Sequence, residues 1–380
     1  MVTAAPKNSS QEMTILFFSH LFERIPAGLS ISVPGTILAQ EIVDKCFWVE
    51  TNNVEDFFSF SVKSFHKQIK VGHHIDLYPQ PFNKPDIVVF FGVYLPIYLT
   101  FAKQLKSNNI PYIIRPASSL TCQAQHNHAF LKKKIANILL FNRFIKEASA
   151  IHYLTEDERR DSGTKWNKHS FVLPNGINIP DSRKTEFSTI GIKACYIGRI
   201  DLYQKGLDLL LKAIIIIQKQ LRESNFCLRL FGPINHDAKK IASLIKKYNI
   251  RDIVSLKGEV SGADKESAFL SSDLFILTSR FEGHSIALLE ALSYGLPVAI
   301  APGTNMKEKV QQYDAGWYCD ETNADSICRM LLDVINQRKQ LPIKGSNALE
   351  LAKTYNYSEI AKQFHKIASQ IIDDAKNVYK

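Results

Sequence analysis

The chain has 380 residues, of which 45% are hydrophobic and 22% charged, a composition typical of a globular protein large enough for two domains. Lys and Arg outnumber Asp and Glu by 47 to 37, so the net charge of +10 favours an anionic ligand, an acidic membrane surface or nucleic acid as partner. The six cysteines form no CxxC pair and no Cys/His group at zinc spacing, so we expect a reducing compartment and no structural metal.

The N-terminal residues 1–12 are polar and lack the apolar core of a signal peptide, so we expect them to be disordered and the protein to be cytoplasmic. The longest apolar stretch runs from Ile87 to Ala102 and is interrupted by Gly92 and Pro96. It is shorter than the roughly 18 to 20 residues that a membrane helix needs. The stretch therefore predicts a buried strand, a turn and the start of a helix.

Short, continuously apolar runs alternate with helical patterns in both halves of the chain, which indicates strands covered on both faces, as in a parallel sheet. The predicted strands are Thr14–Phe18, Ile87–Phe91, Tyr112–Ile114 and Ala150–Leu154 in the first half, and Lys193–Ile197, Cys227–Phe231, Ile253–Leu256, Leu274–Leu277 and Val298–Ile300 in the second. Two βα-repeating halves predict an α/β protein of two Rossmann-like domains facing each other across a central cleft.

The strand pattern breaks near Leu173–Asn178, and the polar stretch Asp181–Lys184 is the predicted inter-domain linker. The domains are then residues 13–180 and 185–357. Residues at about 358–380 are predicted to form a C-terminal amphipathic helix, whose apolar positions are Ile360, Phe364, Ile367 and Ile371. One candidate for the surface on which this helix packs is the first domain.

Candidate functional residues follow the strand that ends at Ile197. Gly198 permits close backbone approach, and Arg199 and Lys205 bring two permanent cations to one loop. Cations at this position would stabilise a departing nucleoside diphosphate. The alternative is that both side chains are simply solvated.

A second group of candidates follows the strand Leu274–Leu277. Glu282 lies in the predicted loop, Ser285 is the predicted N-cap, and Glu290 lies on the helix from Ile286 to Tyr294. Carboxylates accept hydrogen bonds from diols, and the backbone amides of residues 283–286 at a helix start suit a phosphate. Glu290 on a mostly apolar helix needs such a partner unless it faces solvent.

These motifs together resemble glycosyltransferase family 4, whose members have the GT-B fold and retaining chemistry. The resemblance is strongest from Tyr196 to about Asp320. Its motifs, in the order that the family shows, are Gly198-Arg199, Lys205-Gly206, Gly232, and Glu282 and Glu290 followed by Ala291, Gly295 and Pro297.

The resemblance implies a donor site for a nucleoside-diphosphate sugar in the second domain and acceptor binding by the first. Arg199 and Lys205 would bind the diphosphate, Glu290 the ribose and Glu282 the transferred sugar, with Arg199, Lys205 and Glu282 as the catalytic residues. Other expected donor contacts are Gly28, Gly198, Val260, Gly283, His284, Ser285 and Ile286.

The first half departs from the family pattern at two positions. Ala27 and Gly28 stand where two glycines are usual, and Ala117 stands where many relatives have His or Arg. Sugar contacts on this side must come from other residues, for which the candidates are Arg115, Ser118, Ser119 and His126.

The chain has no Asp-x-Asp motif, so we expect the cations and a helix N-terminus to act in place of a divalent metal ion, with no cofactor. The resemblance implies that the acceptor attacks on the face that the diphosphate leaves, with no protein nucleophile. We expect transfer of a hexose or N-acetylhexosamine from a nucleoside-diphosphate sugar, with UDP as the expected nucleotide. The expected acceptor is a glycan, lipid-linked glycan or protein-linked sugar in bacterial surface polysaccharide or glycoconjugate synthesis.

Residues 130–146 combine clustered cations with a broad apolar face, as an interfacial helix does. Two interpretations stay open: peripheral contact with an anionic membrane at its inner face, or packing on the first sheet with the lysines solvated. Rival functions are a GT-B nucleotide-sugar epimerase, a phosphorylase, or a basic nucleic-acid-binding protein. The last is disfavoured because the basic residues are dispersed and no nucleic-acid-binding motif occurs.

Overall fold

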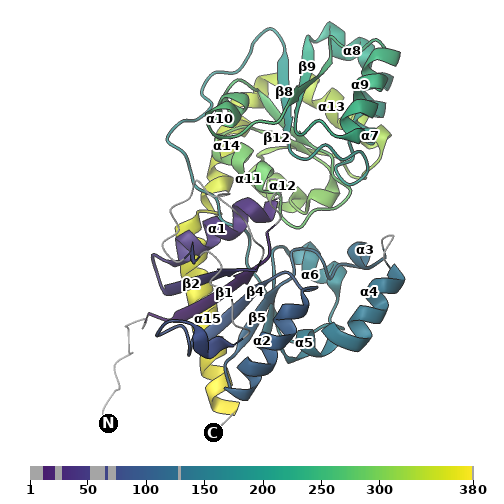
Figure 1. Cartoon of the computed structure of the whole chain (residues 1–380). Coiled ribbons are helices and arrows are strands. Elements are labelled where there is room, and N and C mark those ends of the chain that lie inside the picture. The colour runs from purple at the N-terminus through teal and green to yellow at the C-terminus, as the bar shows by residue number, and fades with distance from the viewer. Residues whose placement is uncertain (1–11, 22–27, 52–64, 67–73, 127–129, 379–380) are drawn as a thin grey trace. The chain divides into compact units, whose positions relative to one another are not determined.

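A computed structural model of the chain describes residues 12–21, 28–51, 65–66, 74–126 and 130–378. Residues 1–11 of the predicted disordered N-terminus thus lie outside the described residues. The chain divides into two compact units (Figure 1). Unit 1 comprises residues 1–153, 159–173 and 360–380, and unit 2 comprises residues 154–158 and 174–359.

Unit 1 is built on a parallel sheet whose described strands have the order β3-β2-β1-β4-β5-β6-β7. The strands are β1 (Thr14–Ser19), β2 (Lys45–Glu50), β3 (Phe65–His66), β4 (Ile87–Phe91), β5 (Tyr112–Arg115), β6 (Ala150–Tyr153) and β7 (Ser170–Val172). Its helical segments are α1 (Gly28–Gln40), η1 (Ile75–Leu77), α2 (Pro96–Ser107), α3 (Cys122–Gln125), α4 (Phe130–Ala136), η2 (Asn137–Phe141), α5 (Asn142–Glu147) and α6 (Glu156–Ser162), the last shared with unit 2.

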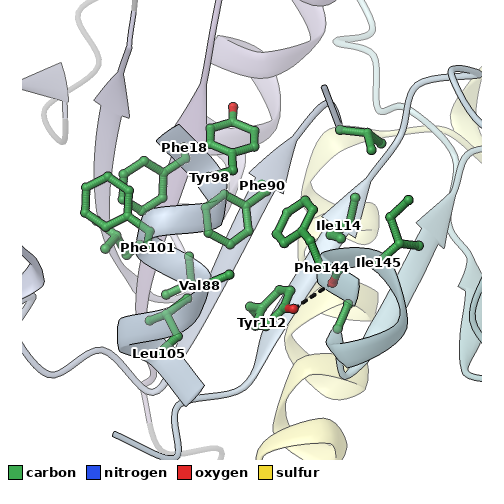
Figure 2. Packing of buried hydrophobic residues seen from close by; sticks show 14 of the residues in the cluster. Phe18, Val88, Phe90, Tyr98, Phe101, Leu105, Tyr112, Ile114, Phe144 and Ile145 are labelled. Carbon is green, nitrogen blue, oxygen red and sulfur yellow. Dashed lines mark hydrogen bonds between the residues drawn. The ribbon is translucent and has the colours of Figure 1, made fainter. Parts of the chain in front are cut away.

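Alternate side chains of a strand point to opposite faces of the sheet. In unit 1 the side chains on both faces are buried, in two separate clusters. Leu16 and Phe18 of β1 pack with α2 and α5 in one cluster, in which Phe90, Phe101 and Phe144 also lie (Figure 2). The rings of Phe18 and Phe101 are 4.4 Å apart. This aromatic packing fixes the helices on that face of the sheet.

The other face of the sheet is covered by α1 and by the C-terminal helix α15 (Tyr357–Val378). Ile15 and Phe17 of β1 pack there with Ile360 and Phe364. Farther along α15 the buried positions are Ala368 and Ile372, whereas the predicted apolar positions Ile367 and Ile371 are only half-buried. The helix is therefore rotated by about one residue from the face that the sequence pattern suggests.

Unit 2 contains a second parallel sheet with the described strand order β10-β9-β8-β11-β12-β13. The strands are β8 (Ile192–Ile197), β9 (Phe226–Phe231), β10 (Val254–Gly258), β11 (Leu274–Leu277), β12 (Val298–Ile300) and β13 (Gly316–Tyr318). The helical segments are α7 (Leu207–Ile216), α8 (Gln218–Glu223), α9 (His236–Lys247), α10 (Gly262–Leu270), α11 (Ile286–Ser293), η3 (Pro302–Thr304), α12 (Lys307–Tyr313), α13 (Ala324–Asn336), η4 (Arg338–Gln340) and α14 (Leu341–Lys353).

Every strand predicted from the sequence is present, within about two residues at each end, but the structure adds four shorter or more polar ones: β2, β3, β7 and β13. The unit boundary falls at Leu173/Pro174, before the polar stretch predicted as linker. Lys184 of that stretch is held on unit 2, because its Nζ lies 3.2 Å from the buried carboxylate of Asp273 and its backbone N–H donates to Tyr294 O at 2.8 Å.

None of the helices in the described ranges is both long and apolar enough to cross a membrane. All six cysteines are free thiols. Within the same ranges, no group of three or more His, Cys, Asp and Glu side chains is arranged to hold a metal ion.

Candidate functional site in unit 2

The candidate donor residues of unit 2 lie at the carboxyl edge of its sheet, where β8 and β11 end side by side. Ligands of open parallel sheets bind at this edge. Two loops form it: residues 198–206, between β8 and α7, and residues 278–285, between β11 and α11. β8 and β11 are neighbours in the sheet, so residues far apart in sequence meet here.

Gly206 holds the first loop against the second. It is the N-cap of α7 in the left-handed conformation, with φ 63°, and a Cβ atom at this position would lie 2.0 Å from Thr278 O. The hydroxyl of Thr278 donates to Lys205 O and Gly206 O at 3.3 and 3.2 Å. Only glycine fits this approach, which places Lys205 beside the end of β11.

A second connection between the loops is made by Arg280. Its guanidinium donates to both carboxylate oxygens of Asp208 at 2.7 and 2.8 Å and to Tyr203 O at 2.6 Å. Its backbone N–H donates to Gln204 O at 2.8 Å. The Asp208 hydrogen bonds raise the pKa of Arg280 above its ordinary value. The sequence reasoning missed both residues, because a bidentate pair between a loop and a helix far apart in the sequence leaves no local spacing signal.

The ion pair between Lys205 and Glu282 is the centre of the candidate site. Lys205 Nζ lies 2.5 Å from Glu282 Oε1, and the two side chains are only 15% and 9% exposed. Ser279 Oγ donates to the same oxygen at 2.6 Å, and Asn305 Nδ2 donates to Glu282 O at 2.7 Å. The structure thus brings together two of the three residues that were predicted to be catalytic.

Arg199, the third predicted catalytic residue, lies on the same loop but is oriented differently. Its guanidinium donates to Gln204 Oε1 and lies 3.7 Å from the Asp201 carboxylate, and the side chain is 44% exposed. Its backbone is fixed by Tyr196, whose hydroxyl donates to Arg199 O at 2.6 Å. Arg199 is therefore a solvent-accessible cation at the same sheet edge, and its guanidinium contacts Gln204 and Asp201.

The strands next to this loop approach each other closely at the predicted glycines. The N–H of Gly198 donates to Phe231 O at 3.0 Å. A Cβ atom on Gly232 would lie 2.1 Å from Gly198 O. The lack of a side chain at Gly232 thus lets the ends of β8 and β9 come into contact, whereas the donor contact expected of Gly198 stays a prediction.

The start of α11 has the predicted cap. Ser285 Oγ accepts from the Leu288 N–H at 3.4 Å, which confirms Ser285 as N-cap. Ile286 and His284 are buried, and Gly283 is half-buried. The helix begins directly after the Glu282 loop, so its first N–H groups lie at the same edge of the sheet.

His284 has a structural contact that the sequence did not indicate. The Asn175 N–H donates to His284 Nδ1, and Asn175 Nδ2 donates to His284 O, both at 3.1 Å. Since Nδ1 accepts this bond, the ring proton belongs on Nε2. The ring of Tyr355 lies 5.3 Å from the imidazole. His284 anchors the loop to the segment after Leu173, and its donor-binding role stays a prediction.

Glu290 does not face solvent. Its carboxylate oxygens lie 2.7 and 2.6 Å from Lys265 Nζ, and the side chains are 19% and 18% exposed. Burial raises the pKa of Glu290 above its ordinary value, and Lys265 opposes that shift. Val260, the predicted neighbour of the base, is half-buried in the loop between β10 and α10.

Of the candidates in unit 1, Gly28 is the exposed first residue of α1, and the preceding Ala27 lies outside the described residues. Arg115 is 2% exposed at the end of β5; it donates to Thr36 Oγ1 at 3.3 Å and lies over the Phe91 ring at 5.2 Å. Its burial suits the interior of the unit more than contact with a bulky acceptor.

The other candidates of unit 1 follow β5 closely. Ala117 and Ser118 are both in the left-handed region, with φ 47° and 68°, a costly backbone for residues other than glycine. Ser119 Oγ donates to Pro116 O at 2.7 Å, whereas His126 is exposed beyond the end of α3. The structure thus places Ser118 and Ser119 in one strained turn and His126 outside it.

The family model "Glycosyl transferases group 1" matches residues 180–374, which is just over half of the chain and includes the whole of this sheet edge. The chain belongs to this family. The predicted membership of a glycosyltransferase family is therefore confirmed at the level of group 1, while family 4 in particular and retention stay predictions.

Two curated relatives and one solved structure illustrate the similarity. An uncharacterised glycosyltransferase of Haemophilus influenzae is 25% identical over 219 residues, covering 56% of this chain and 59% of the relative. The poly(glycerol-phosphate) alpha-glucosyltransferase of Bacillus subtilis is 25% identical over 230 residues, covering 59% of this chain and 33% of the relative. The matched region thus covers less than two thirds of either relative's length.

The crystal structure of Anabaena HepE in complex with UDP superposes with a TM-score of 0.69 at 17% identity, covering 94% of this chain and all of that chain. This similarity confirms the predicted α/β GT-B fold. At 17% identity the similarity concerns the fold alone.

Proposed function

We propose that the protein is a retaining glycosyltransferase that moves a hexose or N-acetylhexosamine from a nucleoside-diphosphate sugar to a glycan, a lipid-linked glycan or a protein-linked sugar. The observation that carries the proposal is the Lys205–Glu282 pair at the carboxyl edge of the second sheet, next to the start of α11. A cation, a carboxylate and helix N–H groups at one edge suit a phosphate joined to a sugar.

In this proposal Lys205 and Arg199 bind the diphosphate and stabilise the charge that develops on it as the sugar leaves. Glu290 accepts hydrogen bonds from the ribose hydroxyls, and Glu282 contacts the transferred sugar. Glu282 is already held by Lys205 and Ser279, which favours a binding role over that of a nucleophile. The leaving phosphate would then accept the acceptor's proton, with no metal ion.

A uridine nucleotide is the donor that we propose, because the structural neighbour HepE was crystallised with UDP. The Bacillus subtilis relative is a poly(glycerol-phosphate) glucosyltransferase, which supports an acceptor in bacterial surface polysaccharide or glycoconjugate synthesis. Six free cysteines suit the cytoplasm, and a lipid-linked acceptor would place the reaction at the inner face of the membrane.

A thermal-shift screen against UDP, GDP and ADP sugars tests the donor, because a ligand that binds the native state raises the unfolding temperature. We expect UDP sugars to give the largest shift. NMR of the product should then show the anomeric configuration of the donor retained, and an inverted product would refute the mechanism. An epimerised sugar formed without acceptor would favour an epimerase. Salt-sensitive binding of DNA with no shift by any sugar nucleotide would favour a nucleic-acid-binding protein.

A further inference from the structure

The helical segment of unit 1 formed by α4, η2 and α5 has apolar side chains on two sides. One side belongs to the core: Phe141, Phe144 and Ile145 are at most 4% exposed and pack in the aromatic cluster under the sheet. Packing on the first sheet, one of the two interpretations of residues 130–146, is therefore correct for this side.

The other side carries four large apolar residues that the core does not cover. Ile135, Ile138, Leu139 and Leu140 are 58%, 64%, 71% and 50% exposed. In the described part of the chain eleven large hydrophobic residues are at least 50% exposed, and four of them lie within residues 135–140. Isolated exposed apolar residues are ordinary, whereas a contiguous group indicates a partner.

The segment cannot hide these residues by rotating. η2 is a π-helical turn, a rare conformation that often occurs at functional positions. Asn137 in this turn points inward, is 6% exposed and donates from Nδ2 to Gln125 Oε1 at 3.0 Å. Turning the exposed side into the core would break this bond and remove Phe141 and Phe144 from the aromatic cluster, so the apolar side is fixed toward solvent.

Cations flank the apolar side. Lys134, Arg143 and Lys146 are exposed, Arg143 to 77% of its side chain. The acidic neighbour Glu147 is shared, because its Oε1 lies 3.0 Å from Arg143 Nε and 2.5 Å from Lys106 Nζ. The local charge is therefore positive. Lys133 is turned away and donates to Ala124 O at 2.5 Å.

We propose that this surface, formed by Ile135, Ile138, Leu139 and Leu140 with the flanking Lys134, Arg143 and Lys146, binds an anionic lipid bilayer peripherally. The apolar side chains enter the boundary between headgroups and acyl chains, and the cations contact anionic headgroups. A bilayer suits the surface better than a second copy of this chain, because two such surfaces would bring like charges together. Four apolar residues are also far fewer than the roughly 20 residues per side of a stable protein interface.

Flotation of the full chain with vesicles tests the proposal without depending on the proposed enzymatic function. We expect the protein to float with equimolar phosphatidylglycerol and phosphatidylcholine vesicles, to float less at high salt, and to stay behind with phosphatidylcholine alone. The double variant Ile138→Ser/Leu139→Ser should lower binding about tenfold or more, since both exposed side chains lose their apolar burial in the lipid.

The matched control is Ile216→Ser/Ile343→Ser, which removes two isoleucines of unit 2 that are 54% and 62% exposed and should bind like wild type. The variant Arg143→Gln/Lys146→Gln should bind more weakly and with less salt dependence. An unchanged unfolding temperature shows that each variant folds.

Three results would overturn the proposal. The first is that the wild-type protein does not float with the anionic vesicles. The second is that the Ile138→Ser/Leu139→Ser variant floats as well as the wild-type protein. The third is a dimer, seen by sedimentation, that the same double variant abolishes, because the surface would then belong to a second copy.

Discussion

The Lys205–Glu282 ion pair predicts that one substitution changes nucleotide binding and turnover in opposite directions. Glu282→Gln keeps the shape of the side chain and an oxygen for the Ser279 hydroxyl but removes the negative charge. Lys205 then directs its full charge at a bound diphosphate, and the repulsion between Glu282 and the phosphates disappears. We therefore expect UDP to bind more tightly and sugar transfer to slow.

The size of the effect follows from the exposure of the pair. An exposed ion pair contributes about 0–1 kcal/mol, whereas removing one partner of a fully buried pair costs about 3–5 kcal/mol. Lys205 and Glu282 are 15% and 9% exposed at 2.5 Å, which lies between these cases. We expect about 1–2 kcal/mol of added UDP affinity, or about 5- to 30-fold in Kd. The rate of transfer should fall about 10²-fold if Glu282 positions the sugar.

Isothermal titration calorimetry with UDP and a transfer assay measure the two effects. Lys205→Met should weaken UDP binding and slow transfer, because it removes the cation itself. The matched control is Glu223→Gln, which removes a carboxylate with a 64% exposed side chain on α8 and should leave both quantities unchanged.

Two outcomes would contradict this reasoning. If Glu282→Gln binds UDP no more tightly than wild type while Lys205→Met loses affinity, the ion pair does not compete with the nucleotide. If neither variant changes UDP binding, the donor phosphates are bound elsewhere in the protein.

Three further predictions concern the stability of unit 2, the loop position Gly206 and the carboxylate of Glu290. Asp273→Ala should lower the free energy of unfolding by about 3–5 kcal/mol in urea denaturation, because it leaves Lys184 without its buried partner; a loss below about 1 kcal/mol would contradict this. Gly206→Ala should weaken UDP binding and lower stability in calorimetry, since its Cβ would meet Thr278 O. Gly262→Ala, also at positive φ but with nothing near its Cβ, should cost only about 1 kcal/mol and spare UDP binding. The raised pKa of Glu290 means that acidification protonates it at higher pH than an ordinary glutamate. UDP affinity should therefore fall on acidification over that higher range, and Glu290→Gln should remove this dependence in a pH series; a dependence that persists in the variant would exclude Glu290.

The sequence by itself determined the fold and the candidate donor residues of unit 2. Strands buried on both faces, such as Leu274–Leu277, are continuous apolar runs. Such runs can be recognised in the sequence without knowing which strands pair. In a parallel sheet the residues after such strands must gather at one edge. For this reason Lys205, after β8, and Glu282, after β11, could be assigned to one site from their order along the chain.

Shorter strands were beyond this reasoning. Gly316–Tyr318 contributes a three-residue strand to the sheet edge. It begins with a glycine at which a Cβ atom would lie only 2.0 Å from Val298 O. Its strand conformation depends on pairing with β12, and a run of three residues has no period of its own.

Only the tertiary structure decided which charged and polar groups are partners. Glu290 pairs with Lys265 on a neighbouring helix, and His284 is held by Asn175, contacts between residues 25 and 109 positions apart. It also decided that Phe141 of the segment 130–146 is buried while Leu139 is exposed. The pattern of residue types along a segment indicates how much apolar or charged surface that segment carries. Which part of that surface is covered depends on the long-range packing that brings distant segments together.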